Sequence, residues 1–401
     1  MDFVQALKTN SLLFDGSFGA YIMSTGIETG DCIMMLNKLN PEGPASVHRA
    51  YMNAGANIAT ANTFIGSAIS LKKHGISEEE AYELNKKGVE IAKKETSGKC
   101  FVGLDMGPSG GMLMPLGEHS FSDMYSSFAV QARAAKDAGA DFVIVETMTD
   151  LAEARIAALC AMEITGLPVV VSLSFEHGRL LTGGTPAAAA AVLEAIGVSA
   201  LGINCSGGPD EILPALIELR KATKLPIVVQ PNAGVPSIVE GKTVFPLNGE
   251  DMLPKMKKIV EAGANAIGGC CGTRPEFIKL FRALQDNRSP MEDFVIEKGK
   301  KLATGRDVFE FSGIDSLKEK CELEPGIDGL YDADPDADYA VLNVSGMDMD
   351  EAEEYMLEAQ QLIKTPVLID GDNDEVRRFA IKVYCGIAMT HGESCFGAIK
   401  V

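Results

Sequence analysis

Three cysteines in this sequence are spaced so that they could bind a metal ion together. Cys270 and Cys271 are adjacent in the Gly-rich run GGCCGT, and Cys205 lies in GINCSGG. Neighbouring strand residues point to opposite faces, so an adjacent pair among glycines suits a bent, closely approached backbone better than a packed core. Three thiolates can hold tetrahedral Zn²⁺ and leave its fourth position open for a substrate. We therefore predict that these three residues bind zinc and that an incoming thiol could take the open position.

The sequence contains nine cysteines, an odd number. The N-terminal residues MDFVQALKTN lack the basic and apolar regions of a signal peptide, which predicts a cytoplasmic protein with reduced thiols. Buried core positions are the expected place for Cys100, Cys160 and Cys385, because free cysteine is among the most buried residue types. A redox dithiol is an alternative interpretation of the adjacent pair, but it would leave Cys205 without a role.

The elements that must position these cysteines are short apolar runs that alternate with amphipathic stretches, a pattern typical of βα units around a parallel sheet. The eight runs are LLFDGSFG (12–19), ANIATANTF (56–64), CFVGLDMGP (100–108), DFVIVETM (141–148), PVVVSLSF (168–175), ALGINCSG (200–207), PIVVQPNAG (226–234) and AIGGCCGT (266–273). Eight runs predict a (β/α)8 TIM barrel. Cys205 and the adjacent pair end the sixth and eighth runs, so all three should face the barrel mouth where active sites lie. A doubly wound sheet is the rival fold, but DGSFGAYIMSTG matches its phosphate loop poorly.

The composition changes along the chain. Residues 290–401 contain 25 acidic and 11 basic residues, so most of the net charge of −20 lies in this tail. We predict a barrel over 1–286, a polar linker over 287–304 and a small acidic α/β unit over 305–401. The acidic balance argues against binding to nucleic acid or to an anionic membrane surface. No apolar run approaches the roughly 20 residues that would span a bilayer.

Four motifs occur in order near the ends of predicted strands. They are LLFDGSFG at the start, GINCSGGP around Cys205, QPNAG at 230–234 and GGCCGTRPEFI at 268–278. Together they resemble the homocysteine S-methyltransferase family, and especially the homocysteine-binding module of cobalamin-dependent methionine synthases. The resemblance extends from about residue 10 to residue 284.

This resemblance implies that the three cysteines bind zinc and that the homocysteine sulfur is the fourth ligand. It also implies that Asp15 and Glu146 hold the substrate amino group, a role that suits two carboxylates facing a cation. Asn204 and Asn232 match positions near the zinc. Asp15, Glu146, Asn204 and Asn232 are therefore the expected substrate-binding residues.

The expected activity is methylation of homocysteine to methionine. A betaine donor would call for aromatic faces around its ammonium group, and the chain has no Trp. The remaining donors are a methylated corrinoid on a separate protein, which the resemblance favours, or S-methylmethionine. Two alternatives stay open: a different thiol acceptor, and a non-catalytic zinc-binding scaffold of a methyltransfer complex.

The tail phrases VLNVSG and PVLIDGDNDE resemble part of a pterin-binding barrel, with Asn343 and Asp370 at matching positions. Where that family continues with Asn-Ser, this chain has Thr390 and His391, and no D-x-H-x-x-G corrinoid motif occurs. A partial barrel leaves an open sheet edge. The tail is therefore expected to dock on the first barrel, or to form a homo-oligomer.

Overall fold

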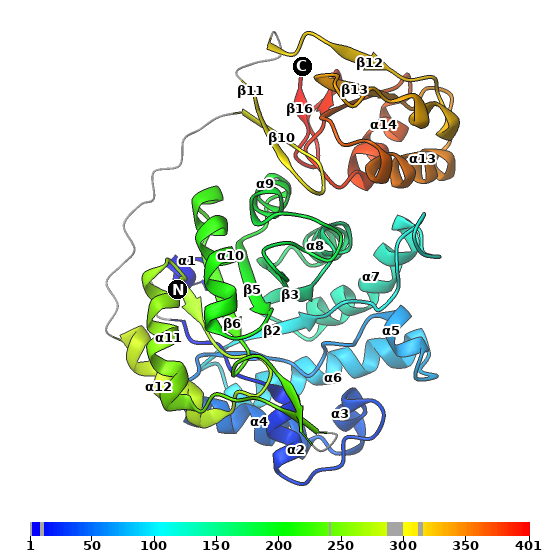
Figure 1. The fold of residues 1–401 in the computed structure, drawn as a ribbon. Coiled ribbons are helices and arrows are strands. Elements are labelled where there is room, and N and C mark those ends of the chain that lie inside the picture. The colour runs from blue at the N-terminus through cyan, green and yellow to red at the C-terminus, as the bar shows by residue number, and fades with distance from the viewer. Residues whose placement is uncertain (1, 9–11, 240–241, 287–299, 312–315) are drawn as a thin grey trace.

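The computed structural model describes residues 2–8, 12–239, 242–286, 300–311 and 316–401. A seven-stranded parallel sheet forms the centre of the larger part (Figure 1), and its strands are neighbours in chain order. They are β1 (Ile58–Thr60), β2 (Phe101–Met106), β3 (Phe142–Met148), β4 (Val169–Leu173), β5 (Ala200–Cys205), β6 (Ile227–Pro231) and β9 (Ala266–Ile267). Each coincides with one of the predicted runs.

Leu13 connects the two edges of this sheet. It forms a parallel bridge with Ile267 of β9, and its carbonyl accepts a hydrogen bond from the N–H of Ile58 in β1 at 3.2 Å. The first predicted run therefore lies where an eighth strand would, although its described residues form a single bridge there and no full strand. The result is an α/β fold with a curled parallel sheet, consistent with a TIM-barrel-like protein.

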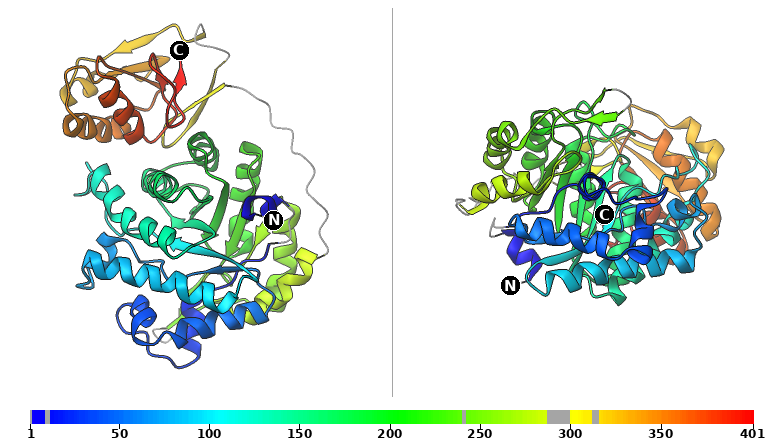
Figure 2. Two further views of the ribbon diagram at one scale, coloured as in Figure 1. Left: turned by 180° about the vertical axis from the view of Figure 1, so that it is seen from behind. Right: turned by 90° about the horizontal axis from the view of Figure 1, so that it is seen from below.

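Long helices pack on the outer face of the curled sheet, and shorter ones contact those helices (Figure 2). They are α2 (Phe18–Ser24), η1 (Ile33–Met35), α3 (Leu36–Leu39), α4 (Glu42–Asn53), α5 (Ala68–Lys72), α6 (Glu78–Thr96), α7 (Phe121–Asp137), α8 (Leu151–Thr165), α9 (Pro186–Ile196), α10 (Pro209–Ala222), α11 (Gly249–Glu261) and α12 (Pro275–Asp286). Side-chain caps start many of them: Ser120 forms a capping box at α7, and Thr185 caps α9. A small hairpin, β7 (Ser237–Val239) and β8 (Lys242–Val244), lies between β6 and α11.

Side chains of β3 show why the strands are apolar on both faces. Val143 and Val145 belong to the core cluster that includes the helices, whereas Phe142 and Ile144 belong to a second cluster inside the sheet. This alternation follows the two-residue period of a strand. Helix α1 (Phe3–Lys8) closes one end of the interior, where Phe3 stacks on Phe142 with ring centroids 4.0 Å apart. The candidate site lies at the other end, at the carboxyl ends of the strands.

The C-terminal part contains a five-stranded parallel sheet. Its elements are β12 (Lys320–Glu322), η3 (Ile327–Asp332), β13 (Tyr339–Asn343), α13 (Met349–Leu362), β14 (Val367–Asp370), α14 (Asp374–Val383), β15 (Met389–Thr390) and β16 (Ile399–Lys400), preceded by the antiparallel hairpin of β10 (Lys300–Ala303) and β11 (Val308–Phe311). Within it, β13, α13 and β14 form a parallel strand–helix–strand unit. Residues 287–299 of the predicted linker lie outside the described residues, and β10 begins within its last part. The domain limits themselves stay a prediction.

The C-terminal part packs on helices of the larger part. The guanidinium group of the buried Arg155 in α8 donates hydrogen bonds to the carbonyls of Ile381, at 3.3 Å, and of Lys382. The carboxylate of the buried Glu353 in α13 accepts from the N–H of Ser122, at 2.8 Å, and from its hydroxyl, at 2.7 Å. Within the described residues, no helix is both long enough and apolar enough to cross a membrane.

Candidate active site

The three predicted zinc ligands come together at one end of the curled sheet. Cys205 is the last residue of β5, and Cys270 and Cys271 follow β9 after two glycines. Their three sulfur atoms lie within 4.8 Å of one another, and all three residues are half-buried. Zinc–sulfur bonds of about 2.3 Å in a tetrahedron place sulfurs about 3.8 Å apart, so this donor set fits zinc with small adjustments.

Asn232 fixes the loop that carries the adjacent cysteines. Its side-chain oxygen accepts a hydrogen bond from the N–H of Cys271 at 3.0 Å, and its side-chain nitrogen donates to the sulfur of Cys205 at 3.7 Å. The N–H of Cys270 donates to the carbonyl of Pro231 at 2.9 Å. One amide side chain therefore sets the spacing between ligands from two different strands.

Asn204 is fully buried and contacts the cluster at Cys270. Its side-chain nitrogen lies 4.0 Å from the sulfur of Cys270 and donates to the hydroxyl of Thr147 at 2.7 Å. Its side-chain oxygen accepts from the N–H of Thr147 at 3.0 Å and from the hydroxyl of Ser172 at 2.8 Å. These contacts hold Thr147 at a φ of 59°, a left-handed conformation that is costly for a β-branched residue.

The three sulfurs share hydrogen bonds with one another. Hydrogen bonds from Cys270 and Cys271 lower the pKa of the Cys205 thiol far below its ordinary value. Hydrogen bonds with Cys205 and Cys271 raise the pKa of Cys270, and the contact with Cys205 raises that of Cys271 to about 11. A metal ion bound by the three sulfurs would displace the thiol protons that these hydrogen bonds use.

Two carboxyl groups lie close to this cluster. Asp15 is 5% exposed, and its carboxylate accepts from the N–H of Thr60 at 2.8 Å and from the Thr60 hydroxyl at 3.0 Å. Burial raises the pKa of Asp15 to about 7. Burial, followed by the charges of Asp15 and Cys205, raises the pKa of Glu146 to about 8. A cationic group would relieve this crowding of negative charge.

The sequence did not reveal the residues that hold the predicted ones. Thr60 fixes Asp15, and Thr147 and Ser172 fix Asn204. The two-residue strand period is the signal that could have found Thr60, because it follows the interior residue Ile58 by two positions. The left-handed backbone at Thr147 carries no comparable signal.

The three cysteines that were expected in core positions lie away from the cluster. Cys160 and Cys385 are buried, Cys100 is half-buried, and burial raises the pKa of all three thiols. None of them belongs to the metal-ligating group found among the described residues.

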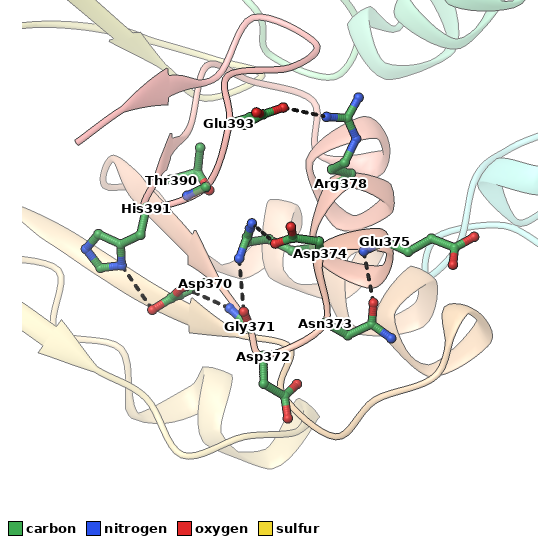
Figure 3. A network of polar contacts seen from close by, with 12 residues as sticks. Asp370, Gly371, Asp372, Asn373, Asp374, Glu375, Arg378, Thr390, His391 and Glu393 are labelled. Carbon is green, nitrogen blue, oxygen red and sulfur yellow. Dashed lines mark hydrogen bonds and ion pairs between the residues drawn. The ribbon is translucent and has the colours of Figure 1, made fainter.

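A second polar group lies at the carboxyl ends of β14 and β15 (Figure 3). Asp370 lies 3.1 Å from Nδ1 of His391 and accepts from the N–H of Gly371 at 3.0 Å. The side-chain oxygen of Asn343 accepts from the N–H of Ser345 at 2.9 Å. These local contacts occupy both residues at the pterin-like positions, and the pterin-barrel resemblance of this part stays a prediction.

Comparisons of the sequence with known proteins agree on one family. Residues 12–284 match the homocysteine S-methyltransferase family. The chain is 29% identical over 353 residues to the methionine synthase of Mycobacterium leprae, covering 83% of this chain and 27% of that protein. It is 30% identical over 305 residues to the methionine synthase of Mycobacterium tuberculosis, covering 71% of this chain and 25% of that protein. The chain thus spans about a quarter of the length of these relatives.

A solved structure supports the same assignment. The metallated form of the homocysteine methyltransferase MmuM from Escherichia coli is 25% identical, with a TM-score of 0.59, over 68% of this chain and 96% of that one. Its apo form is 26% identical, with a TM-score of 0.56. The resemblance expected from the cysteine motifs is therefore confirmed: the chain belongs to the homocysteine S-methyltransferase family.

Proposed function

We propose that this chain is a zinc-dependent homocysteine S-methyltransferase that forms methionine. The observation that carries the proposal is the cluster of three sulfurs within 4.8 Å beside the carboxyl groups of Asp15 and Glu146. A thiol-binding metal site next to an amino-group site suits an amino acid that carries a thiol. Family membership and the likeness to methionine synthases support the same substrate.

We assign each site residue a role that its position supports. Cys205, Cys270 and Cys271 would hold zinc, which when bound supplies a Lewis acid that keeps the substrate thiol deprotonated near neutral pH. Asp15 and Glu146 bind the ammonium group, and Asn204 and Asn232 keep the ligand loops in place. In the reaction the homocysteine sulfur forms a bond to the donor methyl group, the bond between that methyl and its donor breaks, and the bonding electrons leave with the donor.

For the donor we propose a methylated corrinoid carried by a separate protein, because the sequence motifs resemble cobalamin-dependent methionine synthases and the relatives above are methionine synthases. The corrinoid would leave as cob(I)alamin. S-methylmethionine is the alternative donor and would leave as a neutral thioether.

The proposal is tested by incubating zinc-loaded protein with homocysteine and, in turn, with a methylated corrinoid protein, methylcobalamin or S-methylmethionine. Methionine measured by mass spectrometry identifies both the activity and the donor. Zinc-depleted protein should form none until zinc is restored. Stoichiometric zinc binding without methionine from any donor would instead favour the non-catalytic scaffold.

A further inference from the structure

A third carboxyl group, which sequence analysis did not single out, lies inside the sheet at Asp105. Asp105 is on β2, between β1, whose Thr60 holds Asp15, and β3, which carries Glu146. Asp105 pairs with Ile144 across the two strands. Because Ile144 points into the interior, Asp105 does too, and Glu146 is the next interior position along β3.

Asp105 is held firmly by its backbone but not by its side chain. Its N–H donates to the hydroxyl oxygen of Thr63 at 2.9 Å, and its carbonyl accepts from that hydroxyl at 2.9 Å and from the side chain of Gln131 at 3.2 Å. The residue is 7% exposed, yet its Oδ1 atom is buried without a hydrogen-bond partner among the described residues. A buried oxygen of this kind destabilises the protein unless a donor pairs with it.

The surroundings of Asp105 indicate what that partner is. The groups that act on it most strongly, after burial itself, are the negative charges of Glu146 and Asp15, and together they raise its pKa well above the ordinary range. Three carboxyl groups on adjacent segments thus face one region. An ammonium group has three N–H donors and one positive charge, so it can satisfy one oxygen from each.

We propose that Asp105 is a third residue that binds the substrate ammonium group and makes the site specific for an α-amino acid thiol. This inference rests on the proposed function, since it assumes the same acceptor. It adds a contact from β2 to those from Asp15 and Glu146. Desolvated acceptors left unpaired by a substrate without the amino group would discriminate against that substrate.

The test compares two thiols that differ only in the amino group: homocysteine and 4-sulfanylbutanoate. Dissociation constants for both are measured by calorimetry on zinc-loaded wild type and on Asp105→Asn. Loss of one charge-assisted hydrogen bond should weaken homocysteine about 10- to 100-fold and leave 4-sulfanylbutanoate nearly unchanged, so the preference for homocysteine falls by that factor.

Asp141→Asn is the matched control. Its carboxylate holds the opposite end of β2, accepting from the N–H of Val102 at 2.7 Å and pairing with Lys93 at 3.0 Å. Loosening β2 from that end should change both affinities alike. If Asp105→Asn does not fold, Asp105→Ser takes its place in the same comparison.

The outcomes separate the two proposals. A wild type that does not bind homocysteine overturns the proposed function and this inference with it. A wild type that prefers homocysteine, combined with an unchanged preference in the Asp105 variant, overturns the inference alone. A preference lost in the Asp105 variant and kept in Asp141→Asn supports it.

Discussion

Single residues at the sulfur cluster are constrained from several directions at once. Cys271 donates its N–H to Asn232, its carbonyl accepts from the N–H of Ala233 at 2.9 Å, and its sulfur belongs to the cluster. Such outer contacts orient metal ligands and tune their affinity. A substitution can therefore remove the sulfur of a ligand while its backbone stays in place, so the role of the sulfur can be tested by mutation.

Cys271→Ser should abolish stoichiometric zinc binding. A hydroxyl is a much poorer zinc ligand than a thiolate, and two remaining sulfurs leave an incomplete donor set. Zinc content per chain after dialysis, measured by atomic absorption, is expected to fall from about one to near zero. Cys385→Ser changes a buried cysteine of the C-terminal part and should keep its zinc. Full zinc content in the Cys271 variant would contradict the assignment.

The carboxyl groups predict how the stability of the metal-free and ligand-free protein depends on pH. Burial raises the pKa of Glu146 from 4.5 to about 8, so the folded protein keeps a proton that the unfolded chain loses near 4.5. Between these values the folded state binds more protons, and the free energy of unfolding falls as pH rises, by up to about 1.4 kcal/mol per pH unit.

Glu146→Gln removes this titration. Urea denaturation from about pH 5 to about pH 8 should therefore show the variant gaining stability relative to wild type as pH rises. Asp123→Asn, in the exposed capping box of α7, should follow the wild-type curve. Parallel curves for wild type and Glu146→Gln would show that the site does not hold that proton.

The residues that the sequence singled out are those of an unusual type at the ends of strands, namely the three cysteines, Asp15 and Glu146. Their closeness could be predicted because carboxyl ends of parallel strands meet at one mouth. Asp105 was missed because an aspartate in an apolar run has no distinctive pattern of its own. Thr60 was missed because the strand period can place it inside the sheet but does not show which residue it contacts. Their roles arise from hydrogen bonds and charges between segments far apart in the chain.

At the scale of elements, the two-sided apolar character of the runs made the strands predictable, and β2 to β6 lie where expected. Short elements escaped prediction because they carry too few residues to show a period. Helix α1 and the hairpins β7–β8 and β10–β11 are of this kind. What decides their place is packing, as in α1, whose Phe3 fills the end of the sheet against Phe142.

The strand β2 leaves room for that aromatic packing at Gly103. A Cβ atom there would lie 2.4 Å from the ring of Phe142, which is fully buried and cannot move away freely. Gly103→Ala should therefore destabilise the protein by about 1–3 kcal/mol. In Gly19→Ala, a Cβ in helix α2 meets nothing within 4 Å, and the change should be neutral or slightly stabilising. Equal urea midpoints for the two variants would contradict this account of the interior.

At the scale of the whole molecule, the contacts by which the acidic tail packs on the larger part could not be predicted from the sequence. The contacts that hold it involve Arg155 and Glu353, and each looks in the sequence like one more charged residue of a helix. Only the fold buries them against their partners. The formation of an oligomer through this part stays a prediction.

Arg155 places a positive charge at the C-terminal end of helix α14. Ile381 and Lys382 lie at the end of α14, where carbonyls lack partners within the helix and carry the negative end of its dipole. Arg155 reaches them from α8, so a residue of the larger part caps a helix of the other. A salt bridge of 2.7 Å between Lys382 and Glu163 lies beside this contact.

Arg155→Met keeps most of the side-chain volume but removes both hydrogen bonds and the charge. The docking of α14 should weaken by about 1.5–3 kcal/mol, the value of hydrogen bonds to a charged group. Hydrogen–deuterium exchange should then speed up in α14 while β3 keeps its protection, because the larger part retains its own core. Arg133→Met, on the exposed side of α7 with 49% of its side chain exposed, should change neither segment. If α14 exchanges at the wild-type rate in Arg155→Met, the two parts are held together by apolar packing, and the buried arginine does not determine how they dock.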